Sequence, residues 1–516
     1  MNKKTVLSIL IFALIFIILG LPHQNWGFKT DDFGNLYHCN ISSWAEFFKF
    51  FYEGNIEIVW LPPNATTHPQ AFFCGLFRPL SFVYYLPQFF LFNTCAFGYY
   101  LVTIGFHALA AVLLFNLLLM ITTTSLAFLL ALLFGFHPSL YNWLGWTSAQ
   151  SYFIEIVIVL SIIHLLIKYL KTEKIWLYWA ALGLYPCTIF LKEASIVLPF
   201  WVLVGVYLAT RKVSTALKIS SGFWIVACGY LLARLSLFPL TSNTSTLTFE
   251  PTLASFCKRM SSRLFDFVTY VVDMLGLSWL PNSTQLPGYS TIIKFSLLSA
   301  IIICLLWLFI KNSQKKWALF LLWSTLLFSW PALLMHYQPR YIYLGLPFFI
   351  ALLAVLLNRN KIAAILLSIL IPCNALFLHQ KLNVREKTLH HITSSFQELV
   401  KHPATHNRSI CFLGLPGQWF HEGSAQAVWW FGDDATYPVF QIDLDIVISE
   451  LLDKNYITIT QKSNTFIFTS TNPEKLWFLI NNKKASTATI AIDASIQKYN
   501  PVYVTWNYYE KKFVVL

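Results

Sequence analysis

The chain has 516 residues, of which 57% are hydrophobic and 11% are charged, and its formal net charge is +13. So few charges, together with 46 Phe and 19 Trp, exclude a soluble globular protein of this length. The basic residues are dispersed and form no basic face with interleaved aromatic residues, so nothing indicates a nucleic acid as a partner.

Stretches of membrane-spanning length, about 20 apolar residues each, recur up to about residue 380. The first stretch follows Lys3-Lys4 and is not followed by a small-residue cleavage site, so we interpret it as a retained anchor and not as a signal peptide. The prediction is an all-α polytopic membrane protein with about eleven transmembrane helices. We expect the spans near residues 5–21, 97–121, 124–141, 150–168, 175–191, 194–210, 218–239, 291–310, 317–335, 341–357 and 361–379.

Basic residues lie in the short segments between these spans and set the expected orientation. With eleven spans, all five basic clusters fall on one side, which the positive-inside rule makes cytoplasmic. The apolar stretch 264–280 carries Asp266 and Asp273, and counting it as a span would move the fourth cluster to the other side, so we interpret it as an interfacial or re-entrant helix. The clusters are Lys3-Lys4, Lys168/Lys171/Lys174, Arg211/Lys212/Lys218, Lys311/Lys315/Lys316 and Arg359/Lys361.

The pattern divides the chain into a transmembrane domain, residues 1–380, and an extracytoplasmic domain, residues 381–516. The transmembrane domain includes a long first external loop, residues 22–96. The C-terminal part alternates apolar and polar residues as strands do, and its helical candidates are 391–401 and 444–453. We expect a small α+β or mostly β domain with strands beginning near Tyr456, Thr465, Val502 and Lys512.

The acidic pair Asp31-Asp32 lies just after the first span. Adjacent carboxylates at a membrane face are costly to keep ionised, and such groups mark functional sites more often than filler. The alternative is that they cap a short helix. In the same loop, Cys39 and Cys74 form either a disulfide or two unpaired thiols.

Further polar residues gather on the same expected external side. Each has a simpler interpretation, as a snorkelling arginine, a local ion pair or a helix cap. Together, with a long loop to cover them, they indicate a site for an anionic ligand near the membrane surface. They are Arg78, His137, Lys192, Glu193, Arg340 and Tyr341.

The order of these motifs resembles the membrane core of the GT-C glycosyltransferases over roughly residues 1–380. The pattern is most similar to that of the protein O-mannosyltransferases, the tetratricopeptide-linked O-mannosyltransferases and their bacterial relatives. The motifs are the acidic pair, Arg78-Pro79-Leu80, Phe97 to Leu109 with His107, Phe134 to Pro138, Lys192 to Pro199 and Arg340 to Tyr343.

The chain departs from that family pattern in two places. It has no helical repeats after the membrane core. Where the relatives have Glu, Trp, Arg and Asp after the His-Pro motif, this chain has Asn142, Trp146, Gln150 and Tyr152. A second acidic ligand is therefore missing from that loop, so we expect no metal and no other cofactor, and divalent-metal assistance is doubtful.

The resemblance implies transfer of a sugar from a polyprenyl-phosphate donor to an acceptor hydroxyl of a protein, lipid or glycan, on the periplasmic or lumenal face. Because phosphate is already a good leaving group, the chemistry needs a base for the hydroxyl and cations for the phosphate. Asp31 or Asp32 would be the base, one carboxylate raising the pKa of the other. The expected phosphate ligands are Arg78, Lys192 and Arg340, and the expected substrate-positioning residues are His137, Glu193 and Tyr341.

Two other classes of function use similar residues. A transporter or flippase for a lipid-linked sugar would employ the acidic pair in coupling, but such proteins more often show broken helices or inverted repeats. A non-catalytic membrane scaffold would bind partners through its external domain. Replacing Asp31 by Asn separates the classes, because a transferase would lose activity with its fold intact and a scaffold would be unaffected.

Overall fold

The computed structural model describes residues 2–28, 78–237, 314–331, 342–358 and 360–402 continuously. Outside these ranges it describes shorter pieces, which include Asp32, Leu36, Cys39, Met274 and the strands given below. Asp31, Arg340 and Tyr341 lie outside the described residues, as does the stretch 264–280 except for Met274.

Helices make up most of the described chain up to residue 402. The N-terminal group is α1 (Lys3–Ile15), the π-helical turn η1 (Phe16–Gly20), α4 (Leu80–Val83), α5 (Tyr85–Phe92), α6 (Ala96–Leu118) and α7 (Thr124–Gly135). The middle group is η2 (Pro138–Asn142), η3 (Thr147–Ala149), α8 (Gln150–Thr172), α9 (Ile175–Leu191), η4 (Glu193–Val197), α10 (Leu198–Thr210) and α11 (Val213–Leu237). The last group is α14 (Lys315–Phe328), α16 (Leu346–Leu356) and α17 (Lys361–Lys401).

Seven helical segments of the described chain are long and apolar enough to cross a membrane, and α9 and α16 are shorter apolar helices. The seven agree with expected spans, which confirms a multi-pass helical membrane protein. The total of eleven stays a prediction, because most of 291–310 lies outside the described residues. The segments are Lys3–Gly20, Ala96–Leu118, Thr124–Tyr141, Thr147–Thr172, Glu193–Thr210, Val213–Ser236 and Ala364–Lys401.

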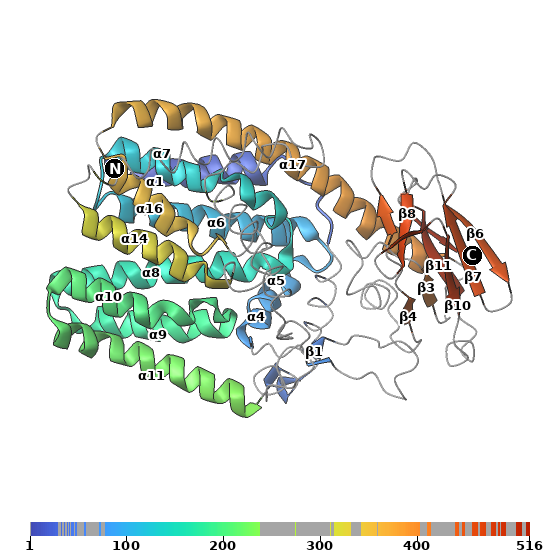
Figure 1. Ribbon diagram of the computed structural model, residues 1–516, viewed down its shortest axis with the longest axis horizontal. Coiled ribbons are helices and arrows are strands. Elements are labelled where there is room, and N and C mark those ends of the chain that lie inside the picture. Colours follow the sequence, from blue (N-terminus) through green and yellow to red (C-terminus); the bar gives the residue numbers. More distant parts are fainter. Residues whose placement is uncertain are drawn as a thin grey trace.

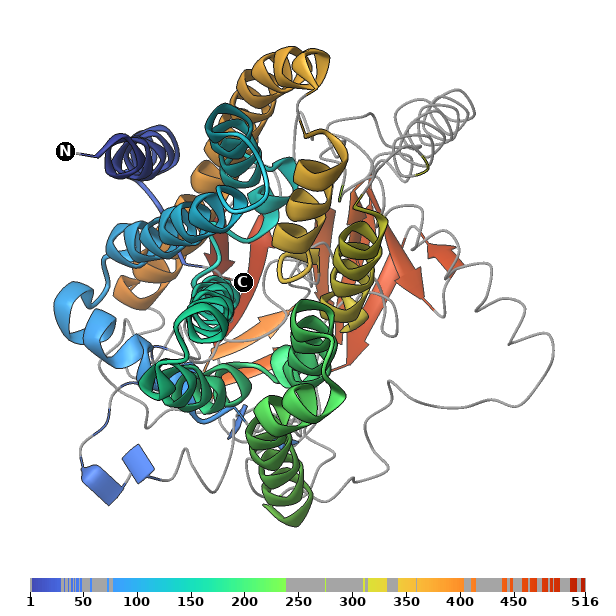
Figure 2. The same cartoon turned by 90° about the vertical axis from the view of Figure 1, so that its left-hand side faces the viewer.

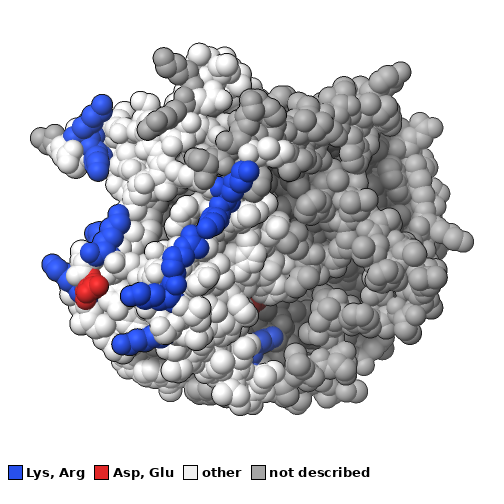
Figure 3. Space-filling model, turned by 60° about the vertical axis from the view of Figure 1, so that its left-hand side comes forward, with Lys and Arg blue, Asp and Glu red and all other residues white. Residues whose placement is uncertain are grey.

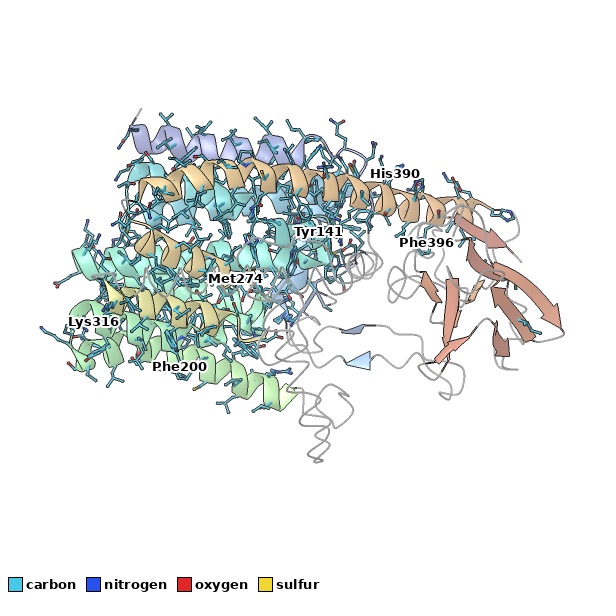
Figure 4. The ribbon with its side chains drawn as sticks, turned by 45° about the horizontal axis from the view of Figure 1, so that its top comes forward. Tyr141, Phe200, Met274, Lys316, His390 and Phe396 are labelled. Atoms are coloured by element: carbon cyan, nitrogen blue, oxygen red, sulfur yellow. The ribbon has the colours of Figure 1, made fainter. Side chains whose placement is uncertain are left out.

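These helices lie side by side, and the strands lie beyond one end of the bundle (Figure 1). Seen from the opposite end, most helices point toward the viewer with the strands behind them (Figure 2). Lys and Arg side chains gather toward this opposite end (Figure 3), and Lys316 lies there (Figure 4). The exposed lysines of the α8–α9 turn, Lys171 and Lys174, belong to the same set of clusters.

The described residues after residue 402 form strands. They are β3 (Ile410–Leu413), β4 (Val439–Ile442), β5 (Ile446–Ile448), β6 (Ile457–Lys462), β7 (Thr465–Ser470), β8 (Leu476–Ile480), β9 (Lys483–Ala485), β10 (Thr487–Ala491), β11 (Val502–Asn507) and β12 (Lys512–Val515). Their sheet orders are β12-β11-β3-β4, with β3 parallel to both neighbours, and the antiparallel β10-β7-β6 and β5-β8-β9. Between α1 and α4, β1 (Ile56–Glu57) pairs with β2 (Phe72–Phe73).

One expected helix is wrong. Within 444–453 the structure has the strand β5, Ile446–Ile448, which pairs with β8. Three consecutive β-branched residues favour a strand over a helix, and pairing with a neighbouring strand adds to that preference. The expected helix 391–401 is confirmed as the end of α17.

Helix α17 runs without interruption for 41 residues, from the bundle to the strands, where it lies against β12. The expected domain boundary at residue 380 falls inside it. His390 and Phe396 lie on its part nearer the strands, and Tyr141 lies at the same end of the bundle (Figure 4).

The segment 23–28, which follows the first span, is fastened to α17. One carboxylate oxygen of Glu386 lies 2.9 Å from the His23 ring and the other accepts from the Asn25 amide at 2.7 Å. The Thr393 hydroxyl accepts from the Phe28 amide at 2.8 Å. On the other side of the segment, the Trp26 ring donates to the Gly145 carbonyl at 2.8 Å. The segment that leads to the acidic pair is therefore held by hydrogen bonds to α17 and to Gly145.

Candidate functional site

Asp32 is fully buried, and one of its carboxylate oxygens is held by Ser148. The backbone amide and the hydroxyl of Ser148 both donate to Oδ1 at 2.7 Å. Ser148 lies in η3, the single turn that leads into α8. Such charge-assisted hydrogen bonds fix the orientation of a carboxylate more firmly than neutral ones. The orientation of the Asp32 carboxylate is therefore fixed by Ser148.

Two tyrosines line the surroundings of Asp32. Both Tyr84 and Tyr85 interact with it electrostatically, and the Tyr85 hydroxyl donates to the Thr147 carbonyl. Burial raises the pKa of both phenols well above their usual range, and the negative charge of Asp32 acts in the same direction. The two phenols therefore stay protonated and uncharged, and Asp32 carries the negative charge in this group.

Arg385 of α17 is a charged neighbour of Asp32 that the sequence analysis did not identify. Its guanidinium interacts electrostatically with the carboxylate of Asp32. Its Nε is buried without a hydrogen-bond partner in the described part of the chain. Arg385 lies beyond the expected domain boundary, and only the length of α17 brings it back to the acidic pair.

Arg78 and Glu193 form a two-pronged ion pair. The guanidinium Nε lies 2.6 Å from Oε2 and Nη2 lies 2.5 Å from Oε1, and both side chains are partly buried. This geometry matches the fork of an arginine to both oxygens of one carboxylate. A phosphate at this point would share Arg78 with Glu193.

Lys192 is buried, with 7% of its surface exposed. Helix α9 ends at Leu191, and Lys192 is extended, with φ −161° and ψ 132°, before η4 begins. Its Nζ lies 3.2 Å from the centre of the Tyr152 ring, in a cation–π contact. The two charges of the Lys-Glu motif therefore have different partners. Lys192 contacts Tyr152 of α8, and Glu193 pairs with Arg78.

Glu155 is a second residue that the sequence analysis missed. It is fully buried on α8, and among the described residues neither of its carboxylate oxygens has a hydrogen-bond partner. Lys192, Glu193 and Arg78 interact with it electrostatically. One signal was available, because Glu155 is the single acidic residue in the apolar stretch 150–168, and an ionisable residue in a span marks a functional site by default.

His137 is buried near the same end of α8. Its Nδ1 lies 2.7 Å from the Ser139 hydroxyl and its Nε2 lies 3.3 Å from the Met274 carbonyl. Trp143 donates to the Ser139 carbonyl and packs edge-on against Tyr152, with 5.8 Å between ring centres. His137 is thus connected to the Lys192 contact through Trp143 and Tyr152.

Tyr343, the last residue of the expected Arg-Tyr-x-Tyr motif, reaches the same region. Its hydroxyl lies 2.7 Å from Nδ1 of His107, and its ring is 4.8 Å from that of Phe153 on α8. Two residues of the sequence motifs, His107 and Tyr343, therefore meet in the core although 236 positions separate them.

The first two turns of α8 and the turn before them connect the site. Ser148 holds Asp32, Tyr152 contacts Lys192, and Glu155 interacts electrostatically with Lys192 and with the Arg78–Glu193 pair. Ser148 and Tyr152 are four residues apart, roughly 6 Å along a helix. A fixed carboxylate and two cations therefore lie within one small region. Among the described residues, no group of three or more His, Cys, Asp or Glu is arranged to hold a metal ion.

No family model and no curated protein matches the sequence. The structure is similar to that of ArnT from Cupriavidus metallidurans bound to undecaprenyl phosphate, with a TM-score of 0.47 and 12% identity over 84% of this chain and 85% of that one. The same protein in its apo state matches with a TM-score of 0.45 and 13% identity, over 85% and 86% of the two chains. At such low similarity, the assignment of function rests on the residues of this chain.

Proposed function

We propose that the protein is a membrane glycosyltransferase that moves a sugar from a polyprenyl-phosphate donor to an acceptor hydroxyl. The observation that carries the proposal is the convergence of a buried, oriented carboxylate, Asp32, with two cations, Lys192 and Arg78, at the start of α8. A transferase with a phosphate leaving group needs these two kinds of group, and needs no acid to expel the phosphate.

Asp31 or Asp32 acts as the base that takes the proton of the acceptor hydroxyl. Ser148 leaves the orientation of Asp32 fixed in advance, which is what a positioned base requires. The other carboxylate of the acidic pair then positions the acceptor or the base. Arg385, from α17, balances the negative charge of Asp32.

Lys192, Arg78 and Arg340 hold the phosphate of the donor and of the polyprenyl-phosphate product. Lys192 already lies in a buried, aromatic setting, where a charge interaction is stronger than in water. Glu193 orients Arg78, while His137 and Tyr341 position the substrate. No step requires a metal ion.

The sidedness of the molecule supports an extracytoplasmic site. Lys and Arg side chains of the described residues gather toward the end of the bundle that Figure 3 brings forward, and Figure 1 shows the strands beyond the other end. The positive-inside rule would assign the basic end to the cytoplasm. The site and the strands would then face the periplasm or lumen, in a multi-pass membrane protein.

The decisive experiment incubates membranes that contain the protein with labelled polyprenyl-phosphate sugars and follows which label moves. Asp31→Asn and Asp32→Asn are measured side by side, with Glu398→Gln, an exposed acid on α17, as the control. We expect one of the two Asn variants to lose transfer by about 10²–10⁴-fold, with donor binding and melting temperature retained.

The control variant should transfer sugar at the normal rate. Near-normal transfer in both Asn variants, or loss that follows unfolding in each, would show that the acidic pair is not catalytic.

A further inference from the structure

Glu386 on α17 is a buried acid that accepts hydrogen bonds from two positions of one short segment. It is 8% exposed. Its Oε2 lies 2.9 Å from Nδ1 of His23, and its Oε1 accepts from the Asn25 amide at 2.7 Å. Acidic residues are rarely buried unless they are paired, and hydrogen bonds to a carboxylate fix geometry more firmly than neutral ones. Both oxygens of Glu386 therefore serve to hold the chain that follows the first span.

The same segment contacts α17 at two further points. The Phe28 amide donates to the Thr393 hydroxyl at 2.8 Å. Gly27 lies so close to α17 that an added Cβ would collide with the Leu389 carbonyl. Glu386, Leu389 and Thr393 are three and four residues apart, so they lie along one face of the helix. One face of α17 therefore fits the whole segment, and Glu386 makes its only two contacts to a carboxylate within the described chain.

The segment is also tied to the turn that holds Asp32. The Trp26 ring donates to the Gly145 carbonyl at 2.8 Å. Three residues after Gly145, Ser148 donates twice to Asp32. Asp32 follows Phe28 by only four residues, which span about 14 Å at most. The contacts to α17 therefore limit directly where the acidic pair can lie.

We propose that Glu386 is a positioning residue for the acidic pair, which holds the preceding segment so that the base meets the acceptor hydroxyl in the required geometry. This inference rests on the proposed function, in which Asp31 or Asp32 is the base. The proposed phosphate ligands Lys192 and Arg78 lie elsewhere, at the end of α9 and before α4. Glu386 therefore affects the chemical step and leaves the binding of the donor unchanged.

The test measures steady-state transfer by the purified full-length protein in nanodiscs, with the labelled polyprenyl-phosphate sugar whose label moves in the assay above. Glu386→Leu removes both acceptors and keeps a similar volume. Its kcat should fall by about 10–10²-fold, because a misplacement of about 1 Å can cost 10²-fold in rate, while the donor KM stays unchanged. An increased donor KM with normal kcat would overturn the positioning role.

Two further variants separate hydrogen-bond geometry from charge. Glu386→Gln keeps an oxygen for the Asn25 amide, and its nitrogen can donate to Nδ1 of His23 in the other tautomer of the ring. It should therefore keep most of the transfer rate, and a loss equal to that of Glu386→Leu would contradict positioning by these hydrogen bonds. Glu398→Leu, which replaces an exposed acid of the same helix, is the matched control and should transfer normally.

Hydrogen–deuterium exchange reports the release of the segment without reference to sugar transfer. The amides of residues 23–28 should exchange faster in Glu386→Leu than in the wild type, and those of α9 should not change. Unchanged exchange of the segment, or faster exchange with normal kcat, would overturn the positioning role. If Glu386→Leu does not fold, Glu386→Asp replaces it with the same expected results, because both oxygens are drawn back by one methylene.

A double variant separates failure of this inference from failure of the proposed function. Combined with whichever of Asp31→Asn and Asp32→Asn loses transfer, Glu386→Leu should cause no further loss, because no base remains to be positioned. A further loss would show that Glu386 acts elsewhere and would overturn the positioning role alone. Normal transfer in both Asn variants would overturn the proposed base, and the positioning role with it.

Discussion

Ser148 fixes Asp32 through two donors that act on one oxygen, so its side chain can be removed without removing the backbone contact. Ser148→Ala should lower sugar transfer roughly tenfold, since a hydrogen bond to a charged group contributes about 1.5 kcal/mol or more. Ser148→Thr retains a hydroxyl and should transfer at close to the normal rate. Initial rates and melting temperatures are measured together. Equal loss of activity in Ser148→Ala and Ser148→Thr would contradict a role of the hydroxyl in orienting Asp32.

His23 makes the stability of the chain sensitive to pH. Burial lowers the pKa of His23 below its usual value of 6.5, although the nearby Glu386 carboxylate works against this and His379 adds to it. The unfolded chain therefore takes up a proton at higher pH than the folded chain does. Stability should be fully present above about pH 6.5 and decrease as the pH falls through that value toward the lowered pKa of the folded protein.

Melting temperatures in detergent, from about pH 7.5 to about pH 5, would check this prediction. His23→Gln should flatten the decline, whereas His390→Gln, an exposed histidine on α17, should leave it unchanged. An identical decline in His23→Gln would assign the pH dependence to other groups.

Sequence reasoning identified residues through short motifs, and it failed where the function of a residue depends on distant partners. Lys192 was expected to bind phosphate and Glu193 to position the substrate, with a local ion pair as the simpler interpretation, but Lys192 contacts Tyr152 and Glu193 pairs with Arg78. Arg385 could not be assigned to the site, because nothing local shows that residue 385 approaches residue 32. Glu155 was detectable as a lone acid in a span, but its neighbour Lys192 was not.

Among the elements, the turn between η2 and η3 has to accept the Trp26 side chain at close range. A side chain at Gly145 would collide with the Trp26 indole, which also stacks on the Tyr100 ring with ring centres 4.4 Å apart. Gly145→Ala should therefore destabilise the protein by about 1–3 kcal/mol. It should also reduce transfer, because Trp26 supports the segment that leads to the acidic pair.

Gly183→Ala on α9 is the control, since nothing lies within 4 Å of its added methyl group. Alanine has the higher helix propensity, so this variant should be as stable as the wild type or slightly more so. Thermal unfolding of both variants gives the comparison, and equal melting temperatures would mean that Trp26 can move away at little cost.

Element types were predictable where hydrophobic periodicity was strong. The alternation near Tyr456, Thr465, Val502 and Lys512 is confirmed by β6, β7, β11 and β12. The helix expected at 444–453 failed because a short apolar stretch is ambiguous by period alone, and pairing with β8 decided it. Cys39 is a buried free thiol, and Cys74 lies outside the described residues.

At the scale of the whole molecule, the positions of the basic clusters predict which parts of the chain are accessible from the extracytoplasmic side of the membrane. In a variant without the nine native cysteines, a cysteine introduced at Lys483 in β9 should react with an impermeant thiol reagent applied to the extracytoplasmic side. A cysteine introduced at Lys315, at the start of α14, should be protected until the membrane is opened. Reaction at both positions, or the reverse pattern, would contradict the orientation and the side proposed for the site.

The length of α17 has a consequence for the size of the acceptor. Its 41 residues extend roughly 60 Å at 1.5 Å per residue, about twice the thickness of a hydrocarbon core. The one proline inside it, Pro372, lies before Glu386 and Thr393, which fasten the helix to the entry of the first loop. From those fastenings to β12, a rod and not a flexible tether sets the height of the strands above the bundle. Under the proposed function, an acceptor that reaches Asp32 from that side must pass between the strands and the bundle. Because α17 fixes their separation, a bulky acceptor is restricted and a slender one is not.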